Sequence, residues 1–350
     1  MSQILTQSAR EYMDNFAQQL AKSYGVSNVA ELFNVSPQLE TKLRAAITES
    51  AEFLKIITVT TVDQIEGQVV DVGVSGLYTG RKAGGRFTKQ VGVGGHKYKL
   101  AETDSCAAIT WAMLCQWANQ GGRDQFMKHL TEFSNQMFAL DIMRVGWNGV
   151  TAAETTNPAE YPLGQDVNEG WIAYVKNRKA SQVVDVDVYF DETNGDYRTL
   201  DAMASDIINN QIHPMFRNDP RLTVFVGSGL IGAAQAKLYD KADKPSEQIA
   251  AQKLDKTIAG RPAYVPPFLP DNAMVVTIPA NLQVLTQHGT VQRKAKHESD
   301  RKQFENAYWR MEGYAVGVLE AFAAYNPEKV HIGPKPEAGA YIGPKPEAGA

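Results

Sequence analysis

The sequence is poor in the residues from which many enzyme sites are built. Only two of its 350 residues are cysteine, Cys106 and Cys115, and they form no Cys-x-x-Cys pair. Two such thiols are typical of buried small side chains in a reduced environment. The six histidines are scattered, and apart from the adjacent pair His297–Glu298 none lies at metal-ligand spacing from another potential ligand. Nucleophile-elbow and phosphate-loop motifs are absent too, so we expect no catalytic residue, no metal and no cofactor.

Long hydrophobic runs are also absent. No stretch approaches the roughly 18 consecutive apolar residues of a membrane span, and the N-terminus has no apolar core of a secretory signal. We therefore expect no membrane contact. The composition, 43% hydrophobic and 21% charged, is that of a globular chain with one large or two medium domains. The net charge of −4 argues against a protein whose main task is coating nucleic acid.

Acidic residues are missing from one whole segment. Between Val72 and Ala101 there is no Asp or Glu, yet this stretch carries Arg81, Lys82, Arg86, Lys89, Lys97 and Lys99. Val70–Val74 alternates as a strand does, Gly80–Arg86 is rich in turn residues, and His96–Leu100 alternates again. This pattern predicts a long two-stranded arm. Such a ribbon is marginally stable alone and leaves open edges, so we expect it to rest on a neighbouring subunit.

Helical patterns flank the arm. The apolar residues of segment 1–33 recur at helical spacing up to Gly25, a typical helix end, and this unit looks detachable from the body. Ser36-Pro37 predicts the start of a second helix. From Arg123 to Val145 an apolar and aromatic stripe predicts a core-facing helix about 35 Å long, which the glycines and asparagine of 146–149 would end.

Shorter elements predict a compact α/β domain over residues 150–285. They are a helix at Trp171 capped by Asp166 and Glu169, a strand from Val183 to Tyr189 that turns at Asn194-Gly195, a helix from Thr199 to Pro214, and buried strands at Leu222–Val226 and Met274–Ile278. The chain ends in a repeated decapeptide, His331–Ala340 and Tyr341–Ala350, in which only the first residue differs. Its proline and glycine content predicts a flexible tail over 327–350.

Two segments offer alternatives to a structural role. Gly227–Gly232 fits the G-x-G-x-x-G pattern of a nucleotide-dependent oxidoreductase, between a predicted strand and a helix. Because Lys244–Gly260 contains no strand-like run that could place an acidic residue, a βαβ unit cannot be completed, and we interpret the motif as a tight turn. The basic arm could instead bind nucleic acid through phosphate contacts, although its few aromatic residues favour contact with an acidic neighbour.

A set of short stretches carries a resemblance over about residues 34–325. They are Ser50–Leu54, Val72–Gly76, Ala139–Gly149, Ala153–Thr155, Gln165–Val167, Gly170-Trp171, Leu200–Ala202, Asn209-Asn210, Asp219-Pro220, Val224–Gly227, Pro267–Asp271 and Ala273-Met274. In order and spacing these resemble the major capsid proteins of Peduovirus-type tailed phages. The resemblance implies the α+β fold named after phage HK97: an N-terminal arm, an extended β-hairpin called the E-loop, a peripheral domain with a long spine helix, and an α/β axial domain.

The resemblance also implies a division of the chain and a role for each part. The parts are an N-terminal helical segment 1–33, an N-arm 34–67, the E-loop hairpin and return strand 68–112, the peripheral domain 113–150, the axial domain 151–285, return strands 286–326 and the repeat tail 327–350. The E-loop would lie over the adjacent subunit, with contacts from Arg81, Lys82, Arg86 and Lys89. Axial domains would cluster at hexamer and pentamer centres. A maturation protease would cut the chain between Phe33 and Asn34 and so remove segment 1–33.

The implied function is that of a self-assembling, non-enzymatic subunit of an icosahedral phage head that encloses double-stranded DNA. The implied partners are further copies of the chain, a scaffolding protein or maturation protease, the portal protein, a decoration protein, and packaged DNA contacted without sequence specificity. The protein would lie in the virion, and in the host cytoplasm before assembly. Two features depart from the family: Gly121-Gly122 lies in a short insertion before the spine helix, and the repeated decapeptide has no counterpart.

Overall fold

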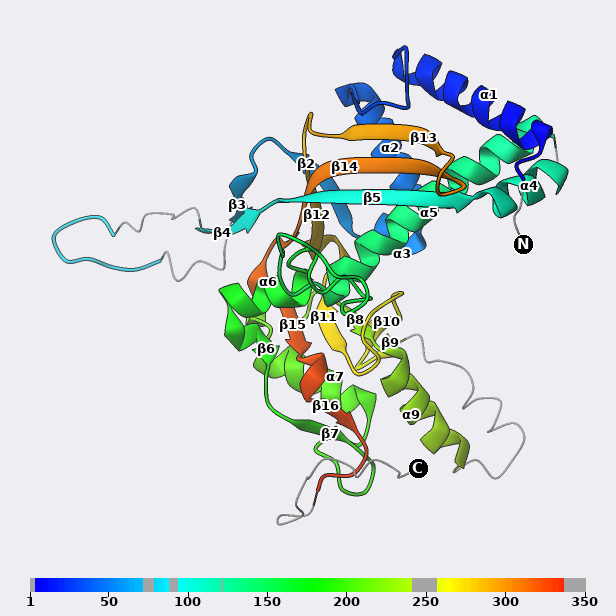
Figure 1. Ribbon diagram of the computed structural model, residues 1–350. Helices are drawn as coiled ribbons and strands as arrows, with labels where there is room; N and C mark the ends of the chain where they lie inside the picture. Colours follow the sequence, from blue (N-terminus) through cyan, green and yellow to red (C-terminus); the bar gives the residue numbers. More distant parts are fainter. Residues whose placement is uncertain (1–3, 72–78, 88–93, 121, 241–256, 337–350) are drawn as a thin grey trace.

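The computed structural model describes residues 4–71, 79–87, 94–120, 122–240 and 257–336. The described chain forms two lobes, each built on a six-stranded sheet, and a two-stranded ribbon projects to one side (Figure 1). In the first lobe the strand order is β1-β13-β14-β12-β2, with β5 also paired to β14. In the second lobe it is β6-β15-β11-β8-β10-β9. Among the described helices, none is long and apolar enough to cross a membrane.

The first lobe is organised around one long strand, β14. Its sheet contains β1 (Phe33–Asn34), β2 (Thr58–Val62), β5 (Ala101–Thr110), β12 (Leu282–Gln287), β13 (Gln292–Glu298) and β14 (Gln303–Val316). β14 pairs with β5 on one edge and with β13 and then β12 on the other. β12 therefore belongs to this sheet, although its first four residues lie in the predicted axial segment 151–285. Buried and exposed positions alternate along β5, and Cys106 lies on the exposed side, contrary to the expected burial.

Five helices belong to this lobe: α1 (Gln7–Tyr24), α2 (Pro37–Glu49), α3 (Glu52–Ile56), α4 (Trp111–Gln120) and α5 (Arg123–Asn148). α1 ends at Gly25 in the left-handed region, φ 68°, as predicted. α5 is the predicted long helix and continues to Asn148. Gly146 does not end it but lies inside it. The residue at this position is glycine because a Cβ there would collide with the ring of Trp171. Pro37 opens α2 as predicted, whereas Ser36 makes no side-chain capping bond.

The second lobe is the predicted α/β domain. Its sheet contains β6 (Val183–Val184), β8 (Thr223–Val226), β9 (Thr257–Ile258), β10 (Arg261–Tyr264), β11 (Met274–Thr277) and β15 (Phe322–Tyr325). Its helices are α6 (Trp171–Arg178), α7 (Leu200–Asn210), α8 (Pro214–Arg217) and α9 (Ser228–Asp240). Thr199 caps α7 by accepting from the amide of Ala202, as predicted. Pro214 opens α8 and does not by itself end α7, which stops at Asn210.

Two local predictions for this lobe are wrong. The N-cap of α6 is Gly170, not Asp166 with Glu169. The Asp166 carboxylate instead accepts from the amide of Asn157 at 2.6 Å, and the Glu169 carboxylate accepts from Arg178 at 2.8 Å. The strand predicted over 183–189 is two strands in different sheets: β6 pairs with β15, and β7 (Val188–Phe190) pairs in parallel with β16 (Val330–Ile332).

The pairing of β16 corrects the predicted start of the flexible tail. Flexibility was predicted from residue 327 onward, but a 3-10 turn over Pro327–Lys329 leads into β16, and Val330 is 1% exposed. The first decapeptide copy therefore begins inside a strand. Residues 337–350, which include the second copy, lie outside the described residues.

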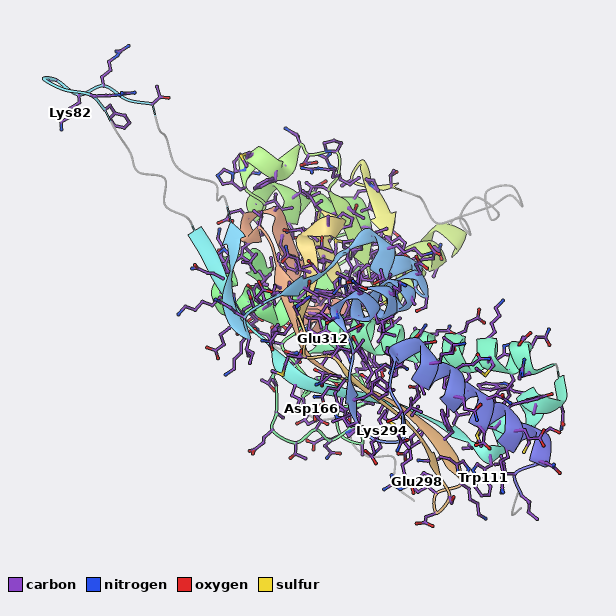
Figure 2. The ribbon with its side chains drawn as sticks, turned by 90° about the horizontal axis from the view of Figure 1, so that it is seen from above. Lys82, Trp111, Asp166, Lys294, Glu298 and Glu312 are labelled. Atoms are coloured by element: carbon purple, nitrogen blue, oxygen red, sulfur yellow. The ribbon has the colours of Figure 1, made fainter. Side chains whose placement is uncertain are left out.

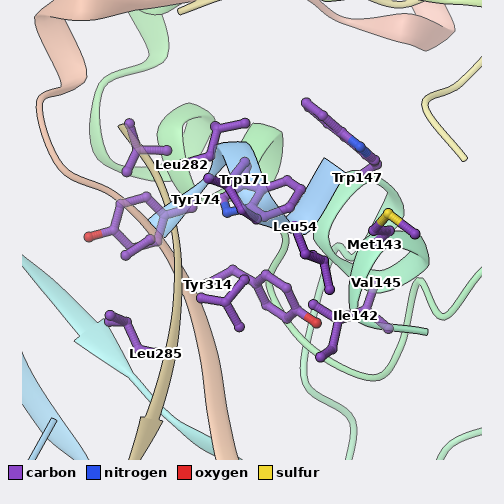
Figure 3. Packing of buried hydrophobic residues seen from close by; sticks show 14 of the residues in the cluster. Leu54, Ile142, Met143, Val145, Trp147, Trp171, Tyr174, Leu282, Leu285 and Tyr314 are labelled. Carbon is purple, nitrogen blue, oxygen red and sulfur yellow. The ribbon is translucent and has the colours of Figure 1, made fainter. Parts of the chain in front are cut away.

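A shared core joins the two lobes at the C-terminal end of α5 (Figure 3). The Trp147 ring on α5 lies 4.9 Å from that of Trp171 on α6 and 5.8 Å from that of Phe225 on β8. Phe53 on α3 contacts all three rings, at 5.5 to 6.2 Å between centroids. Tyr314 on β14 meets the Trp171 ring edge-on at 5.6 Å. Aromatic packing of this density fixes the angle between the lobes.

Candidate assembly surfaces

The arm is anchored firmly at its base. β3 (Glu66–Asp71) pairs in antiparallel fashion with β4 (Gly94–Lys99). Tyr98, 8% exposed, packs into the shared core below Gly67, and its hydroxyl donates to the carbonyl of Gln64 at 3.3 Å. The guanidinium Nε of Arg178 on α6 donates to the carbonyl of Lys97 at 2.8 Å. Tyr98 is buried and Lys97 is exposed, which agrees with the alternation predicted over His96–Leu100.

The tip of the arm, residues 79–87, is exposed at every position. Figure 2 places Lys82 well away from both lobes. Gly84 adopts φ 77°, which explains a glycine in this turn, and the ring of Phe87 lies against Gly80. Arg81, Lys82 and Arg86 are exposed together at this tip, while Lys89 lies outside the described residues. The tip can therefore meet another molecule without any rearrangement of the lobes.

The N-terminal segment, which the sequence predicts to be a separate helical unit, is packed against the first lobe. Leu5, Ala9, Met13 and Phe16 share a buried cluster with Val29 and with residues of β5, α4, α5, β13 and β14, which are Ile109, Leu114, Ala118, Phe126, Leu130, Ala295 and Phe304. The ring of Phe16 meets that of Phe304 edge-on at 5.8 Å, and the ring of Tyr12 lies 5.5 Å from that of Phe126. Burial of these side chains holds α1 on the lobe.

A polar contact fixes the end of the same segment. Arg293 on β13 is 6% exposed, and its guanidinium donates to the hydroxyl of Tyr24 at 3.0 Å and to the side-chain carbonyl of Asn306 at 2.6 Å. Asn306 in turn donates to the hydroxyl of Ser134 at 3.0 Å. Tyr24 therefore supplies one of the two side-chain acceptors of the buried Arg293 guanidinium, whose Nε has no hydrogen-bond partner.

The predicted processing site lies in β1. Phe33 pairs with Arg293 and Asn34 with Gln292, so both residues form a short strand at the edge of the first sheet. The Phe33 ring packs on Tyr24 at 5.3 Å, whereas Asn34 is exposed. Leu32, immediately before them, is 50% exposed. The segment is thus extended and reachable on its N-terminal side, but hydrogen-bonded to the sheet.

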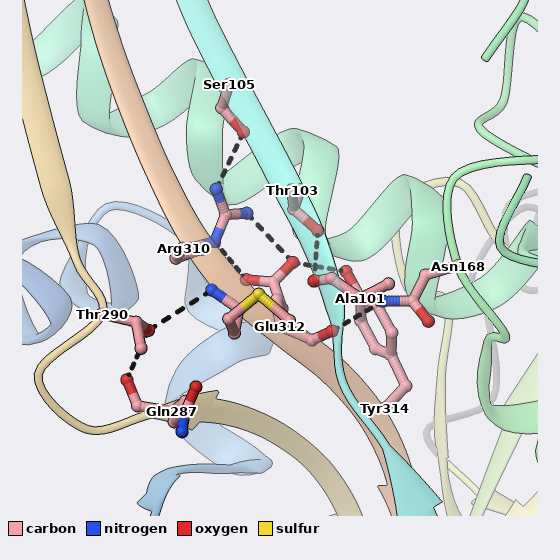
Figure 4. A network of polar contacts seen from close by, with 10 residues as sticks. Ala101, Thr103, Ser105, Asn168, Gln287, Thr290, Arg310, Glu312 and Tyr314 are labelled. Atoms are coloured by element: carbon pink, nitrogen blue, oxygen red, sulfur yellow. Dashed lines mark hydrogen bonds and ion pairs between the residues drawn. The ribbon is translucent and has the colours of Figure 1, made fainter. Parts of the chain in front are cut away.

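A buried polar network crosses the first lobe where β14 meets β5 (Figure 4). Arg310, Glu312 and Tyr314 alternate along β14 and share one face, each 3% exposed. The Arg310 guanidinium binds the Glu312 carboxylate, with one contact at 2.9 Å, and donates to the hydroxyl of Ser105 at 2.9 Å. Burial alone would lower the pKa of Arg310, but the adjacent Glu312 carboxylate outweighs it and the pKa lies above its ordinary value. Sequence reasoning did not single out these residues.

The Gly227 turn has the geometry of a βαβ unit, which corrects one prediction. β8 and β10, which precede and follow α9 in the chain, pair in parallel. β10 begins directly after Lys244–Gly260, the stretch in which no strand was predicted, and β9 lies inside that stretch. The N-terminus of α9 is nevertheless occupied: the Asp271 carbonyl accepts from the Leu230 amide at 3.2 Å, and its carboxylate accepts from the Ser228 hydroxyl at 2.5 Å. An acidic side chain and a carbonyl at this position repel a pyrophosphate, which argues against a dinucleotide here.

The part of the chain that the structure describes contains no candidate metal-binding site. No three of its His, Cys, Asp and Glu side chains are grouped closely enough to hold a metal ion. The described features are thus an anchored arm, a packed N-terminal segment and a stiff double-lobed body, which together suit contact between many copies of one chain.

Comparison with known proteins identifies the family. The model of the phage major capsid protein P2 family matches residues 12–327. This chain belongs to that family. The capsid protein of Escherichia phage P2 is 28% identical over 342 residues, covering 90% of this chain and 94% of its own length. The major capsid protein of Serratia phage KSP20 is 26% identical over 310 residues, covering 83% and 88%.

Among solved structures, a satellite phage P4 procapsid that includes the size determination (Sid) protein contains a similar chain. It superposes with a TM-score of 0.71 at 25% identity, covering 93% of this chain and 99% of that one. The predicted HK97-like capsid fold and the predicted function as a major capsid protein of a tailed phage are confirmed. The protein is a component of the phage virion that forms a shell with copies of itself.

Proposed function

We propose that this capsid protein closes a DNA-filled icosahedral shell from hexamers and pentamers in which each arm, residues 68–100, lies over the adjacent subunit. The observation that carries this proposal is the exposed basic tip on an anchored ribbon. Base contacts such as Arg178 to Lys97 hold the ribbon in one direction, while its edges and the cations at 81, 82 and 86 face outward. The ribbon gains stable partners only from another molecule.

Shell strength would come from many such overlaps. Each contact can be weak, because closure of the shell makes every further contact effectively intramolecular. Identical copies offer each tip an equivalent surface with acidic residues, and the protein is acidic overall, with a net charge of −4. Electrostatic attraction would then guide the tip and set its register.

The N-terminal segment, residues 1–33, is proposed to be a temporary part of the subunit. Cleavage between Phe33 and Asn34 by a maturation protease would free a segment whose apolar face covers Phe126, Leu130 and Phe304. It would also remove the Tyr24 hydroxyl that accepts a hydrogen bond from the buried Arg293. Cleavage would thereby change the surface of the first lobe and couple processing to a change in the shell.

Further partners belong to the same proposal. A scaffolding protein would direct closure in the host cytoplasm, a portal protein would occupy one vertex, and a decoration protein would bind the finished surface. Packaged double-stranded DNA would touch the inner face through non-specific phosphate contacts. Catalysis forms no part of the proposed role.

Charge reversal at the arm tip tests the overlap. Arg81→Glu, Lys82→Glu and Arg86→Glu together are expected to leave the subunit folded, because all three side chains are exposed, but to abolish particles seen by sedimentation and electron microscopy. The matched control reverses Lys22, Lys42 and Lys128, which are exposed on α1, α2 and α5. Normal particles from the arm variant would refute the proposed contact. If the parent protein forms no particles but binds DNA, and the arm variant loses that binding, the result would favour the nucleic-acid alternative.

Processing is tested by mass spectrometry of the chain from mature particles. The expected mature chain begins at Asn34. A start at another residue would refute the proposed bond, and a chain that keeps its α1 helix in DNA-filled particles would refute processing itself.

A further inference from the structure

The start of the repeated tail is bound to the second lobe through backbone contacts. β16 pairs in parallel with β7, in the register His331 to Tyr189 and Ile332 to Phe190. Beyond the strand, the amide of Gly333 donates to the carbonyl of Phe190 at 3.2 Å. The tail thus adds a strand to an edge of β7, a mode in which the backbone supplies affinity and the side chains supply specificity.

The turn after β7 holds the next residues of the tail. The Lys335 amide donates to the carbonyl of Asn194 at 2.7 Å, and the side-chain amide of Asn194 donates to the carbonyl of Lys335 at 3.0 Å. The Lys335 ammonium lies 2.9 Å from one carboxylate oxygen of Asp196. The other oxygen of Asp196 accepts from the amide of Tyr189 at 3.0 Å, which ties the turn to β7.

Two further features define the bound motif. The His331 ring stacks on that of Tyr189 with centroids 4.9 Å apart, and its Nε2 lies 2.9 Å from an oxygen of Asp187. Gly333 adopts φ 134°, a conformation that side chains disfavour. The site therefore favours an aromatic residue at position 331, glycine at 333 and lysine at 335.

The second decapeptide copy carries the same motif. Ile342, Gly343, Pro344 and Lys345 repeat residues 332–335, so every backbone contact and the lysine contact can be made again. The one difference is Tyr341 in place of His331. A tyrosine ring can stack on Tyr189, and its hydroxyl can donate to the carboxylate of Asp187. Each chain thus has one site and two ligands for it.

We propose that the edge of β7, with Asp187, Asn194 and Asp196, is a peptide-docking site that accepts the second decapeptide copy of an adjacent subunit. The inference rests on the proposed function, because it needs subunits held side by side. Within one chain the first copy fills the site most easily, since Val330 is buried beside Val188 and leads directly into it. The second copy could fill its own site only by looping ten residues out and back to the same point, which costs closure entropy.

Exchange between neighbours has no such geometric restriction. Ten residues span up to about 33 Å when extended, so the second copy can leave its own lobe. In the exchange, the neighbour's second copy displaces the first copy from β7 and repeats its contacts at positions 332–335, with Ala340 in place of the buried Val330. Most of the lost contacts are thereby regained, as in domain swapping. In a shell the links add through multivalency.

A disulfide trap in assembled particles tests the occupant. Asn194→Cys with Lys345→Cys should form cross-links between chains in assembled particles, seen as a ladder in non-reducing gels. Asn194→Cys with Lys335→Cys should form links within chains, because residues 194 and 335 exchange two hydrogen bonds. The parent protein, which keeps Cys106 and Cys115, gives the background. Links from position 345 that stay within chains, or no links from 345 while 335 links, would overturn the proposal.

A binding measurement that needs no particles separates this inference from the proposed function. The full chain with Gly333→Ala and Gly343→Ala, which weakens both tail copies, should bind a labelled peptide of the sequence Tyr341–Ala350 by fluorescence polarisation. A peptide with alanine at its third position should bind about tenfold more weakly, because it must adopt the conformation of Gly333. Equal binding of both peptides, or binding of neither, would overturn the assigned site even if shells form normally.

Discussion

Glu312 is a carboxylate almost wholly inside the protein, and its partner Arg310 is buried with it. Glu312→Ala should lower the free energy of unfolding by about 3–5 kcal/mol, because it leaves the Arg310 guanidinium buried without its main acceptor. Replacing both residues, as Arg310→Met with Glu312→Leu, should cost less than the single change, since no charge is then stranded. Chemical denaturation measures the free energy of unfolding of both variants. A double variant less stable than the single one would contradict the predicted cost of an unpaired Arg310.

A second single residue, His297, should make the stability of the fold depend on pH. Burial lowers the pKa of His297 below its ordinary value of 6.5, and Arg10 on α1 adds to the effect while Asp14 and Glu298 oppose it. Its ring stacks on that of Trp111 at 5.4 Å. Because the unfolded chain binds the proton more readily, stability should fall as pH drops below about 6.5.

The expected result is a melting temperature that drops more between pH 7.5 and pH 5.5 in the parent than in His297→Phe, which keeps the stacked ring but cannot titrate. An equal drop in both proteins would show that His297 does not contribute. The difference between the two proteins removes the common effect of the carboxylates, which titrate in both.

At the scale of the elements, the turn between β8 and α9 depends on Gly227 but not on Gly232, which lies inside α9. A Cβ at Gly227 would overlap the carbonyl oxygens of Pro270 and Asp271, whereas a Cβ at Gly232 meets nothing within 4 Å. Gly227→Ala should therefore destabilise the second lobe, while Gly232→Ala in α9 should be neutral or stabilising by about 0.5–1 kcal/mol. Thermal melting compares them, and equal effects would contradict the proposed crowding at Gly227.

The packing of α1 is measurable as a coupling between elements. Phe126→Ala should cost about 3–5 kcal/mol in the full chain. It should cost less when Tyr12→Ala is already present, because the two rings contact each other at 5.5 Å. Tyr197→Ala in the second lobe is the control, since its ring contacts Tyr325 instead, and there the costs should add. Additive costs for Tyr12 and Phe126 would mean that α1 does not hold the lobe.

Elements with strong local signals could be predicted from the sequence. The stripe of α5, the alternation at the base of the arm and the cap at Thr199 each depend on neighbours in the chain. α4, Trp111–Gln120, was not predicted; it has no acidic residue in its first turn and no basic residue in its last turn to mark its ends. β16 was missed, and β7 was predicted only as the end of a single strand over 183–189, because a three-residue strand exists only through its partner, which lies far along the sequence.

The candidate surfaces were predictable to different degrees for the same reason. The basic tip was visible as a run without acidic residues, and the structure leaves Arg81, Lys82 and Arg86 exposed. Packing of α1 was not visible, because an amphipathic helix does not reveal which surface it covers. Nor was the network of Arg310 and Glu312, since an alternating strand looks the same whether its polar face meets water or another strand.

At the scale of the whole molecule, the design is a stiff body with extensions that reach outward. The aromatic core around Trp147 and Trp171 joins the two lobes into one unit. The arm at one side and the docked tail at the end of the second lobe are separate extensions (Figure 1). Both depend on edges of strands, which another copy of the chain can extend.

The position of the arm tip in an assembled particle tests the central claim most directly. A cryo-electron microscopy map of shells made from this chain should place residues 79–87 against the surface of a neighbouring subunit, with Arg81, Lys82 and Arg86 near its acidic side chains. A map in which those residues fold back onto their own lobes, with no neighbour in contact, would contradict the account.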